Sequence, residues 1–130
     1  MTGIFIYGSL KEAGSADTHT LTGFGLYQDP ALPYPVILPV RHGKVWGQVI
    51  GILDEELPMV DRYERFDPQR YQSSLYWRVP VRPTPDVGRE VWVYVGNPAL
   101  WFPADLIRIR DGHWKGPHDD SPCPAKEDNA

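Results

Sequence analysis

The sequence predicts a single α+β domain in which short β-strands outnumber helices. The chain of 130 residues contains 14 prolines and 12 glycines, which divide it into short segments and favour short strands over long helices. Its hydrophobic content of 42% is ordinary for a globular protein with a buried core. A chain of this length fits one domain and leaves little room for a second. We place the domain at residues 1–116 and expect the polar, proline-containing segment 117–130 to be a disordered tail.

Apolar runs and alternating patterns predict six strands. The run that ends at Gly8 is short and wholly apolar, which is typical of a strand buried on both faces. Two later segments alternate with the period of a strand, and the second of them places aromatic residues between its valines, so both of its faces should be covered. Trp46, Trp77 and Trp92 lie on these strands and are expected in the core. The predicted strands are Ile4–Tyr7, Gly23–Tyr27, Val36–Pro39, Lys44–Leu53, Leu75–Val81 and Glu90–Val95.

One helix is predicted immediately after the fourth strand. Asp54 can cap it, and the acids that follow suit the positive end of its dipole. Pro58 restricts regular hydrogen bonding upstream, so the helix begins anywhere from Asp54 to Leu57. Further along, Leu106–Arg110 is compatible with an edge strand or with a helix that starts at Pro103.

The predicted helix carries an acid among its core-facing residues. Leu53, Leu57, Val60 and Glu64 fall at i, i+4, i+7 and i+11, which places them on one face of a helix. Three of them are apolar and should face the core, and Glu64 continues the same stripe. Asp61 lies one position off this stripe and is expected nearer solvent.

A buried glutamate has two interpretations, and the sequence leaves both open. An unpaired buried carboxylate is strongly disfavoured, so a structural ion pair with a nearby arginine is one of them. The alternative is a carboxyl group whose pKa is raised by apolar surroundings, so that it is poised as a general base. The arginines that could pair with Glu64 are Arg62, Arg65, Arg70 and Arg78.

The turn Tyr7-Gly8-Ser9-Leu10 is the second candidate site element. Glycine permits backbone conformations closed to other residues and lets a ligand approach the main chain. Successive amides in such a turn can bind an anion, although many turns of this kind are purely structural. Tyr34-Pro35 lies in a loop that either walls a pocket or forms a simple rigid turn.

Composition argues against several other classes of function. The net charge is −4, from 13 Lys and Arg against 17 Asp and Glu, so the basic face needed for nucleic acid is not expected. The four histidines lack the spacing of metal ligands, and Cys123 is the only cysteine, which suits a reducing compartment. No segment is long and apolar enough to span a bilayer, so we expect a cytoplasmic protein without a membrane partner.

The two candidate elements together resemble a known family. Tyr7-Gly8-Ser9-Leu10 followed by Asp61-Arg62-Tyr63-Glu64 in a helix is similar to the motifs of the gamma-glutamylcyclotransferase-like superfamily, and the resemblance extends over residues 3–114. It implies a compact mixed barrel of mostly antiparallel strands with a few short helices. It also implies a pocket in which the turn faces the glutamate.

The resemblance further implies a reaction and its residues. In this reaction a gamma-glutamyl group closes to 5-oxoproline and expels an amine or amino acid, with no metal or organic cofactor. Glu64 would be the general acid/base, and Tyr7, Gly8, Ser9, Leu10 and Tyr71 would contact a small gamma-glutamyl substrate. Two alternatives stay open: removal of a gamma-glutamyl protecting group in a biosynthetic pathway, and a non-catalytic small-molecule-binding module.

Arg65 departs from the family pattern, in which many members have glycine after the glutamate. Its side chain could narrow the entrance of the pocket. It could instead pair with Glu64 and lower the pKa of that carboxyl group. The leaving group and the oligomeric state are not specified by the sequence.

Overall fold

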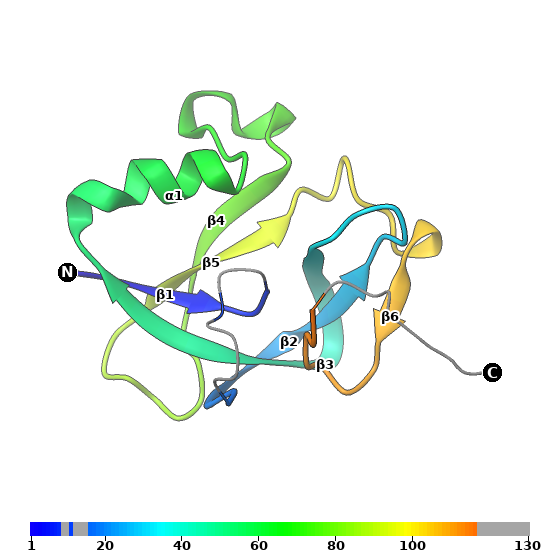
Figure 1. The fold of residues 1–130 in the computed structure, drawn as a ribbon, viewed down its shortest axis with the longest axis horizontal. Helices are drawn as coiled ribbons and strands as arrows, with labels where there is room; N and C mark the ends of the chain where they lie inside the picture. Colours follow the sequence, from blue (N-terminus) through cyan, green and yellow to red (C-terminus); the bar gives the residue numbers. More distant parts are fainter. Residues whose placement is uncertain (9–10, 12–15, 117–130) are drawn as a thin grey trace.

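A mixed six-stranded sheet, curled into a half-barrel, organises the molecule (Figure 1). The computed structural model describes residues 1–8, 11 and 16–116. The order of the strands is β4-β5-β1-β3-β2-β6, and every neighbouring pair is antiparallel except β1 and β5, which are parallel. The predicted fold class, a mixed and mostly antiparallel sheet with few helices, is therefore confirmed.

The elements follow one another with short helical turns between strands. The strands are β1 (Thr2–Ile6), β2 (His19–Gln28), β3 (Pro35–Ile52), β4 (Tyr76–Val81), β5 (Val91–Gly96) and β6 (Ile107–Ile109). The helical elements are α1 (Leu57–Tyr63) and the 3₁₀ turns η1 (Asp54–Glu56), η2 (Pro68–Ser73) and η3 (Pro103–Asp105). The sequence left Leu106–Arg110 open between an edge strand and a helix that starts at Pro103, and each is partly right. A helical turn begins at Pro103, and the short edge strand β6 follows it.

The third and fourth predicted strands are one continuous strand, β3, of 18 residues. The prediction left residues 40–43 outside both strands. His42 has a φ of 65°, and the register with β2 shifts between Thr22 and Phe24, so the ladder bends without ending. This bend lets β3 pair with β2 along most of its length and with β1 at its C-terminal end.

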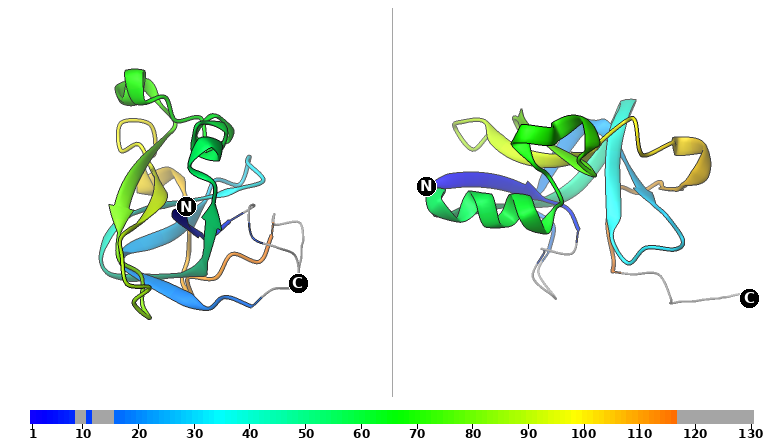
Figure 2. Two further views of the ribbon diagram at one scale, coloured as in Figure 1. Left: turned by 90° about the vertical axis from the view of Figure 1, so that its left-hand side faces the viewer. Right: turned by 90° about the horizontal axis from the view of Figure 1, so that it is seen from above.

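Strand β1 is buried on both faces, which explains why its sequence is uniformly apolar. Phe5 belongs to one hydrophobic cluster, whereas Ile4 and Ile6 belong to the other. Figures 1 and 2 show α1 lying along β1, and Leu57 and Val60 of the helix pack against the second cluster. The C-terminal end of β1 is thereby fixed between the sheet and the helix.

The core differs from the prediction in its tryptophans. Trp46, Trp77 and Trp92 were expected to be core residues, but each is only partly buried. Trp77 and Trp92 pack against the hydrophobic clusters without being enclosed by them. Trp77 lies on the edge strand β4, and the guanidinium of Arg78 stacks over the ring of Trp92. The buried tryptophans are Trp101 and Trp114, from segments outside the strands.

Leu53 also differs, because its side chain is half exposed. It occupies the cap position before η1 and not a helical position, so the helical stripe begins only at Leu57. Across the described ranges, no helix is long and apolar enough to cross a membrane.

Gly112 provides a test of how the C-terminal turn supports the sheet. Its φ is +75°, and an added Cβ would lie 2.3 Å from the carbonyl oxygen of Lys44, while its own carbonyl accepts a hydrogen bond from the amide of Trp46. We expect Gly112→Ala to lower the free energy of unfolding by roughly 2–4 kcal/mol, measured by urea denaturation. Gly88 is the matched control, since its φ is +86° but an added Cβ would meet no atom within 4 Å. Gly88→Ala should cost only about 1–2 kcal/mol, and equal losses in the two variants would contradict the steric explanation.

Candidate active site

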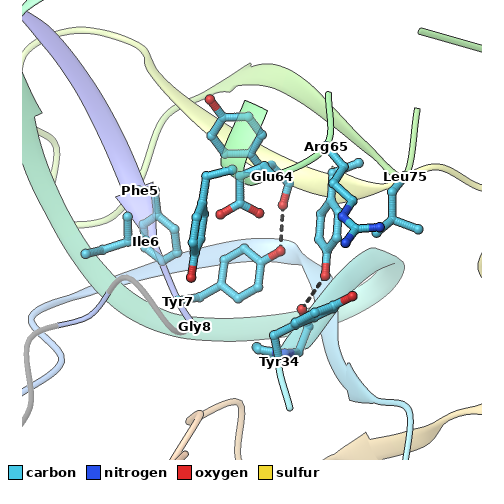
Figure 3. Close-up of a pocket in the computed structure, with 12 residues that line it drawn as sticks. Phe5, Ile6, Tyr7, Gly8, Tyr34, Glu64, Arg65 and Leu75 are labelled. Carbon is cyan, nitrogen blue, oxygen red and sulfur yellow. Dashed lines mark hydrogen bonds between the residues drawn. The ribbon is translucent and has the colours of Figure 1, made fainter. Parts of the chain in front are cut away.

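A cavity of about 190 Å³ lies at the C-terminal end of β1 (Figure 3). Its walls come from the end of β1, the loop before β3, the C-terminal end of α1, and strands β4 and β5. Most of the lining side chains are aromatic or apolar, and the two charged ones are Glu64 and Arg65. The lining residues are Phe5, Ile6, Tyr7, Gly8, Tyr34, Pro35, Tyr63, Glu64, Arg65, Leu75, Tyr76 and Tyr94.

Glu64 is turned into this cavity by the end of helix α1. It occupies the C-cap position, and its amide donates a hydrogen bond of 2.9 Å to the carbonyl of Val60. Because Val60 and Leu57 pack against the core, the same face of the helix directs Glu64 inward. In Figure 3 its carboxyl group points toward the ring of Tyr7. Burial raises the pKa of the Glu64 carboxyl from 4.5 to about 7.

The structure does not support the ion-pair interpretation of Glu64. Among the described residues, no basic side chain lies within 4.0 Å of its carboxylate, and Arg78 is engaged with Asp61 instead. Arg65 lines the cavity, but in Figure 3 its guanidinium lies beside Leu75, apart from the carboxylate. The proposed lowering of the Glu64 pKa by Arg65 is therefore wrong, because that pKa is raised.

The hydroxyls of Tyr7 and Tyr76, two of the tyrosines that line the cavity, donate their protons to main-chain carbonyls. Tyr7 donates a hydrogen bond of 2.6 Å to the main-chain carbonyl of Tyr94, and Tyr76 donates one of 2.7 Å to that of Pro35. Burial is the main reason that the pKa of each of these phenols is raised, and the nearby charge of Glu64 raises it further. Both phenols therefore stay protonated and continue to donate hydrogen bonds to these carbonyl groups.

Asp61 has a structural role that the prediction missed. It was expected nearer solvent, but it is only 6% exposed. Its carboxylate accepts a hydrogen bond of 2.6 Å from the hydroxyl of Tyr94 and lies 3.0 Å from Nε of Arg78. The Arg78 guanidinium in turn stacks 4.3 Å from the ring centre of Trp92. The hydroxyl proton of Tyr94 is thus also committed to a group other than Glu64.

The predicted substrate clamp, Tyr7–Leu10, is only partly described. Tyr7 and Gly8 lie at the cavity wall, whereas Ser9 and Leu10 lie outside the described residues. The amide of Lys11 donates a hydrogen bond of 2.9 Å to the carbonyl of Gly8, which closes a turn. Gly8 is required for close packing and not for a positive φ, because an added Cβ would lie 2.9 Å from Cγ of Pro35.

The remaining predicted residues separate into two groups. Tyr34 and Pro35 do wall the cavity, and Tyr34 contacts the ring of Tyr76 edge-on at 6.5 Å. Tyr71 lies outside the cavity lining, is 51% exposed and packs edge-on against Trp77. The sequence did not single out Tyr76, and the only available signal was a tyrosine at the start of a predicted strand.

The turn beyond Gly8 is fastened to the C-terminal part of the domain by a cluster of charged side chains. Asp17 accepts hydrogen bonds of 2.9 Å from Nζ of Lys11 and 2.8 Å from Nδ1 of His113. The same Lys11 ammonium also donates to the carbonyl of Trp114 at 3.0 Å. No group of three or more His, Cys, Asp or Glu side chains in the described part of the chain is placed to hold a metal ion.

Fold and site together place a carboxyl group of raised pKa in the cavity of a small α+β half-barrel. A family model described as gamma-glutamyl cyclotransferase, AIG2-like, matches residues 4–116. Protein AIG2 C of Arabidopsis thaliana is 33% identical over 121 residues, which cover 85% of this chain and 73% of the relative. The chain belongs to the gamma-glutamyl cyclotransferase, AIG2-like family, as the two sequence motifs indicated. Membership supports an enzyme of the gamma-glutamyl cyclotransferase type at the level of the family.

Two solved structures have a similar fold. An uncharacterised protein from Pyrococcus horikoshii superimposes with a TM-score of 0.60 at 16% identity, covering 87% of this chain and 89% of the other. A solution structure of an Arabidopsis thaliana protein gives a TM-score of 0.56 at 25% identity, covering 73% and 68% of the two chains. The first likeness concerns the fold alone.

The raised pKa of Glu64 makes a prediction about stability. The folded protein keeps this proton up to a pH of about 7, whereas the unfolded chain releases it near 4.5, so stability falls as pH rises through that window. We expect Glu64→Gln to raise the free energy of unfolding by about 3 kcal/mol at pH 8 and by little at pH 4.5, measured by urea denaturation.

The control for this prediction is Glu55→Gln, which alters an exposed acid in the turn that precedes the same helix. It should change stability equally at the two pH values. A Glu64→Gln gain that is the same at pH 4.5 and pH 8 would show that the carboxyl is not destabilised by ionisation.

Proposed function

We propose that the protein cyclises a gamma-glutamyl group to 5-oxoproline and releases an amine or amino acid, with Glu64 as general acid/base. One observation carries the proposal: a carboxyl group with a pKa of about 7 faces an aromatic cavity. The hydroxyl protons of Tyr7, Tyr76 and Tyr94 are engaged with other groups. A pKa near the working pH suits a group that must both accept and return a proton.

The first step requires a base. The alpha-amino group of the substrate arrives as an ammonium ion, which has no lone pair with which to attack. Glu64 accepts one proton from it, and the free amine then forms a bond to the gamma-carbonyl carbon of the same molecule. Because both reacting groups belong to one substrate, the cavity mainly has to hold the chain folded in attack geometry.

The second step requires an acid. The tetrahedral intermediate breaks its bond to the leaving nitrogen, and the proton held by Glu64 is transferred to that nitrogen. The ring nitrogen, which still carries two protons, then gives one of them through Glu64 to the departing amine. The products are 5-oxoproline and the amine as its ammonium ion, and neither water nor another reactant is consumed. Main-chain amides of the Tyr7–Leu10 turn would hold the alpha-carboxylate or the developing oxyanion, and Gly8 lies at the cavity wall where this contact would be made.

Loss of the base should abolish the reaction. We expect wild-type protein to release 5-oxoproline from at least one member of a panel of gamma-glutamyl amines and amino acids, detected by chromatography. Its kcat/KM should rise with pH around a midpoint near 7, where Glu64 ionises. Glu64→Gln should lower kcat by roughly a hundredfold or more, since it can no longer carry a proton.

Glu55→Gln serves again as the control and should retain full activity. Release that continues undiminished in Glu64→Gln would refute the assignment of the base. Binding of panel members without any 5-oxoproline would favour a non-catalytic small-molecule-binding module.

The packing of Gly8 predicts a separate effect on binding. The Cβ of a valine at this position would lie 2.9 Å from Cγ of Pro35, which is too close. The turn and the loop that wall the cavity must therefore move apart. We expect Gly8→Val, in the Glu64→Gln background, to weaken binding of a gamma-glutamyl compound at least tenfold by calorimetry. Gly51→Val is the matched control, since an added Cβ there would meet only the flexible side chain of Met1, and unchanged affinity in Gly8→Val would exclude the turn as a substrate contact.

A further inference from the structure

A shallow depression beside the cavity is lined by three arginines. Arg62, Arg65 and Arg70 contribute to it, and it has a volume of about 300 Å³. Arg65 lines both the depression and the cavity, so the two spaces adjoin at this residue. The other residues of this arginine depression are Phe66, Asp67, Ser73 and Ser74.

The depression is positively charged although the protein carries a net charge of −4. None of the guanidinium groups of Arg62, Arg65 and Arg70 forms an ion pair with a described residue; the described arginines that do so are Arg78 and Arg82. The one acid of the depression, Asp67, has a local role, because its Oδ1 accepts the amide of Gln69 at 2.9 Å. Three arginines therefore face solvent with a single carboxylate among them.

Arg65 is held in a backbone conformation that favours glycine. Its φ is 56°, in the left-handed region, which is unfavourable for a long side chain. This conformation ends helix α1, because the amides of Arg65 and Phe66 donate hydrogen bonds back to carbonyls of its last turn. The turn needs a left-handed residue at this position, but it does not need an arginine side chain. The guanidinium has no described partner that would explain the choice of arginine on structural grounds.

The size of the cavity indicates which part of a substrate reaches the depression. A volume of about 190 Å³ is below the roughly 300 Å³ at which pockets for drug-sized ligands begin. The cavity therefore suits the gamma-glutamyl group itself, and a leaving group that extends past Arg65 reaches the depression. Guanidinium groups bind carboxylates and phosphates through paired, charge-assisted hydrogen bonds.

From this arrangement, and on the basis of the proposed function, we infer that the leaving group of the natural substrate carries at least two anionic groups, which the arginine depression binds. The anionic groups are carboxylates or phosphates on the substituent of the departing amine. Arg65 contacts the group nearest the scissile bond, and Arg62 and Arg70 contact the more distant one.

Binding to Glu64→Gln, which cannot turn substrate over, tests this inference by calorimetry. The probes are gamma-glutamyl-ethylamine, gamma-glutamyl-alanine, gamma-glutamyl-aspartate and gamma-glutamyl-phosphoserine, whose leaving groups differ mainly in negative charge. We expect the aspartate or phosphoserine conjugate to bind at least tenfold more tightly than the ethylamine conjugate, and the better of the two identifies the anion. Raising the salt concentration should reduce this preference, because exposed charges are screened.

Arg65→Gly, added to Glu64→Gln, separates a binding role from a structural one. Glycine relieves the left-handed conformation, so this variant should unfold at higher temperature while losing most of the preference for the charged conjugates. Arg62→Gln and Arg70→Gln should each reduce the preference several-fold. Arg110→Gln, an exposed arginine beyond β6 at the opposite edge of the sheet from β4, should leave it unchanged.

Equal affinity for all four probes would overturn the inference, as would a preference that survives Arg65→Gly undiminished. The outcome for the proposed function is read separately, from the wild-type protein. A clear preference in binding, together with no 5-oxoproline from wild type, would refute the cyclisation reaction and leave the anion site standing. If wild type turns over the ethylamine conjugate as efficiently as the aspartate conjugate, the anion site is refuted and the cyclisation reaction stands.

Discussion

The site depends on one constraint, which is that a carboxyl group is removed from water without receiving a charged partner from the described part of the chain. Burial alone raises the pKa of Glu64 to about 7. Any strong donor aimed at this carboxylate would return its pKa toward the ordinary range. The surrounding residues must therefore fill the space around Glu64 while their own polar atoms are satisfied by other groups.

The tyrosines and Asp61 meet this requirement. The hydroxyls of Tyr7 and Tyr76 donate to main-chain carbonyls, and that of Tyr94 donates to Asp61. Asp61 also forms an ion pair with Arg78 of strand β4. The negative charge of the acid nearest to Glu64 along the helix is thereby neutralised. The arrangement keeps the Glu64 carboxyl group desolvated at the expense of stability, a compromise that is common where a site needs a desolvated group.

Much of the fold and half of the site could be predicted from local patterns. Periodicity placed Glu64 on the inward face of α1, and the uniform apolar run identified β1 as a strand covered on both sides. Asp61 was misplaced because its partners, Arg78 and Tyr94, lie on strands that are distant in the sequence, and a helical stripe contains no information about them. The prediction of two strands in place of β3 was wrong for a related reason, because the residue types found at a β-bulge are also those found at a turn. The position of Tyr71 depended on the path of η2, which the sequence does not specify.

The fastening of the turn at Gly8 has a consequence for how the protein is made. The ammonium of Lys11 reaches the carbonyl of Trp114, 103 residues later in the chain, and Asp17 reaches His113 over 96 residues. A nascent chain can form the sheet from β1 to β5 before these partners have been synthesised. The wall of the cavity is then the last part to be secured, so the growing chain acquires its binding site only when synthesis of the domain is almost complete.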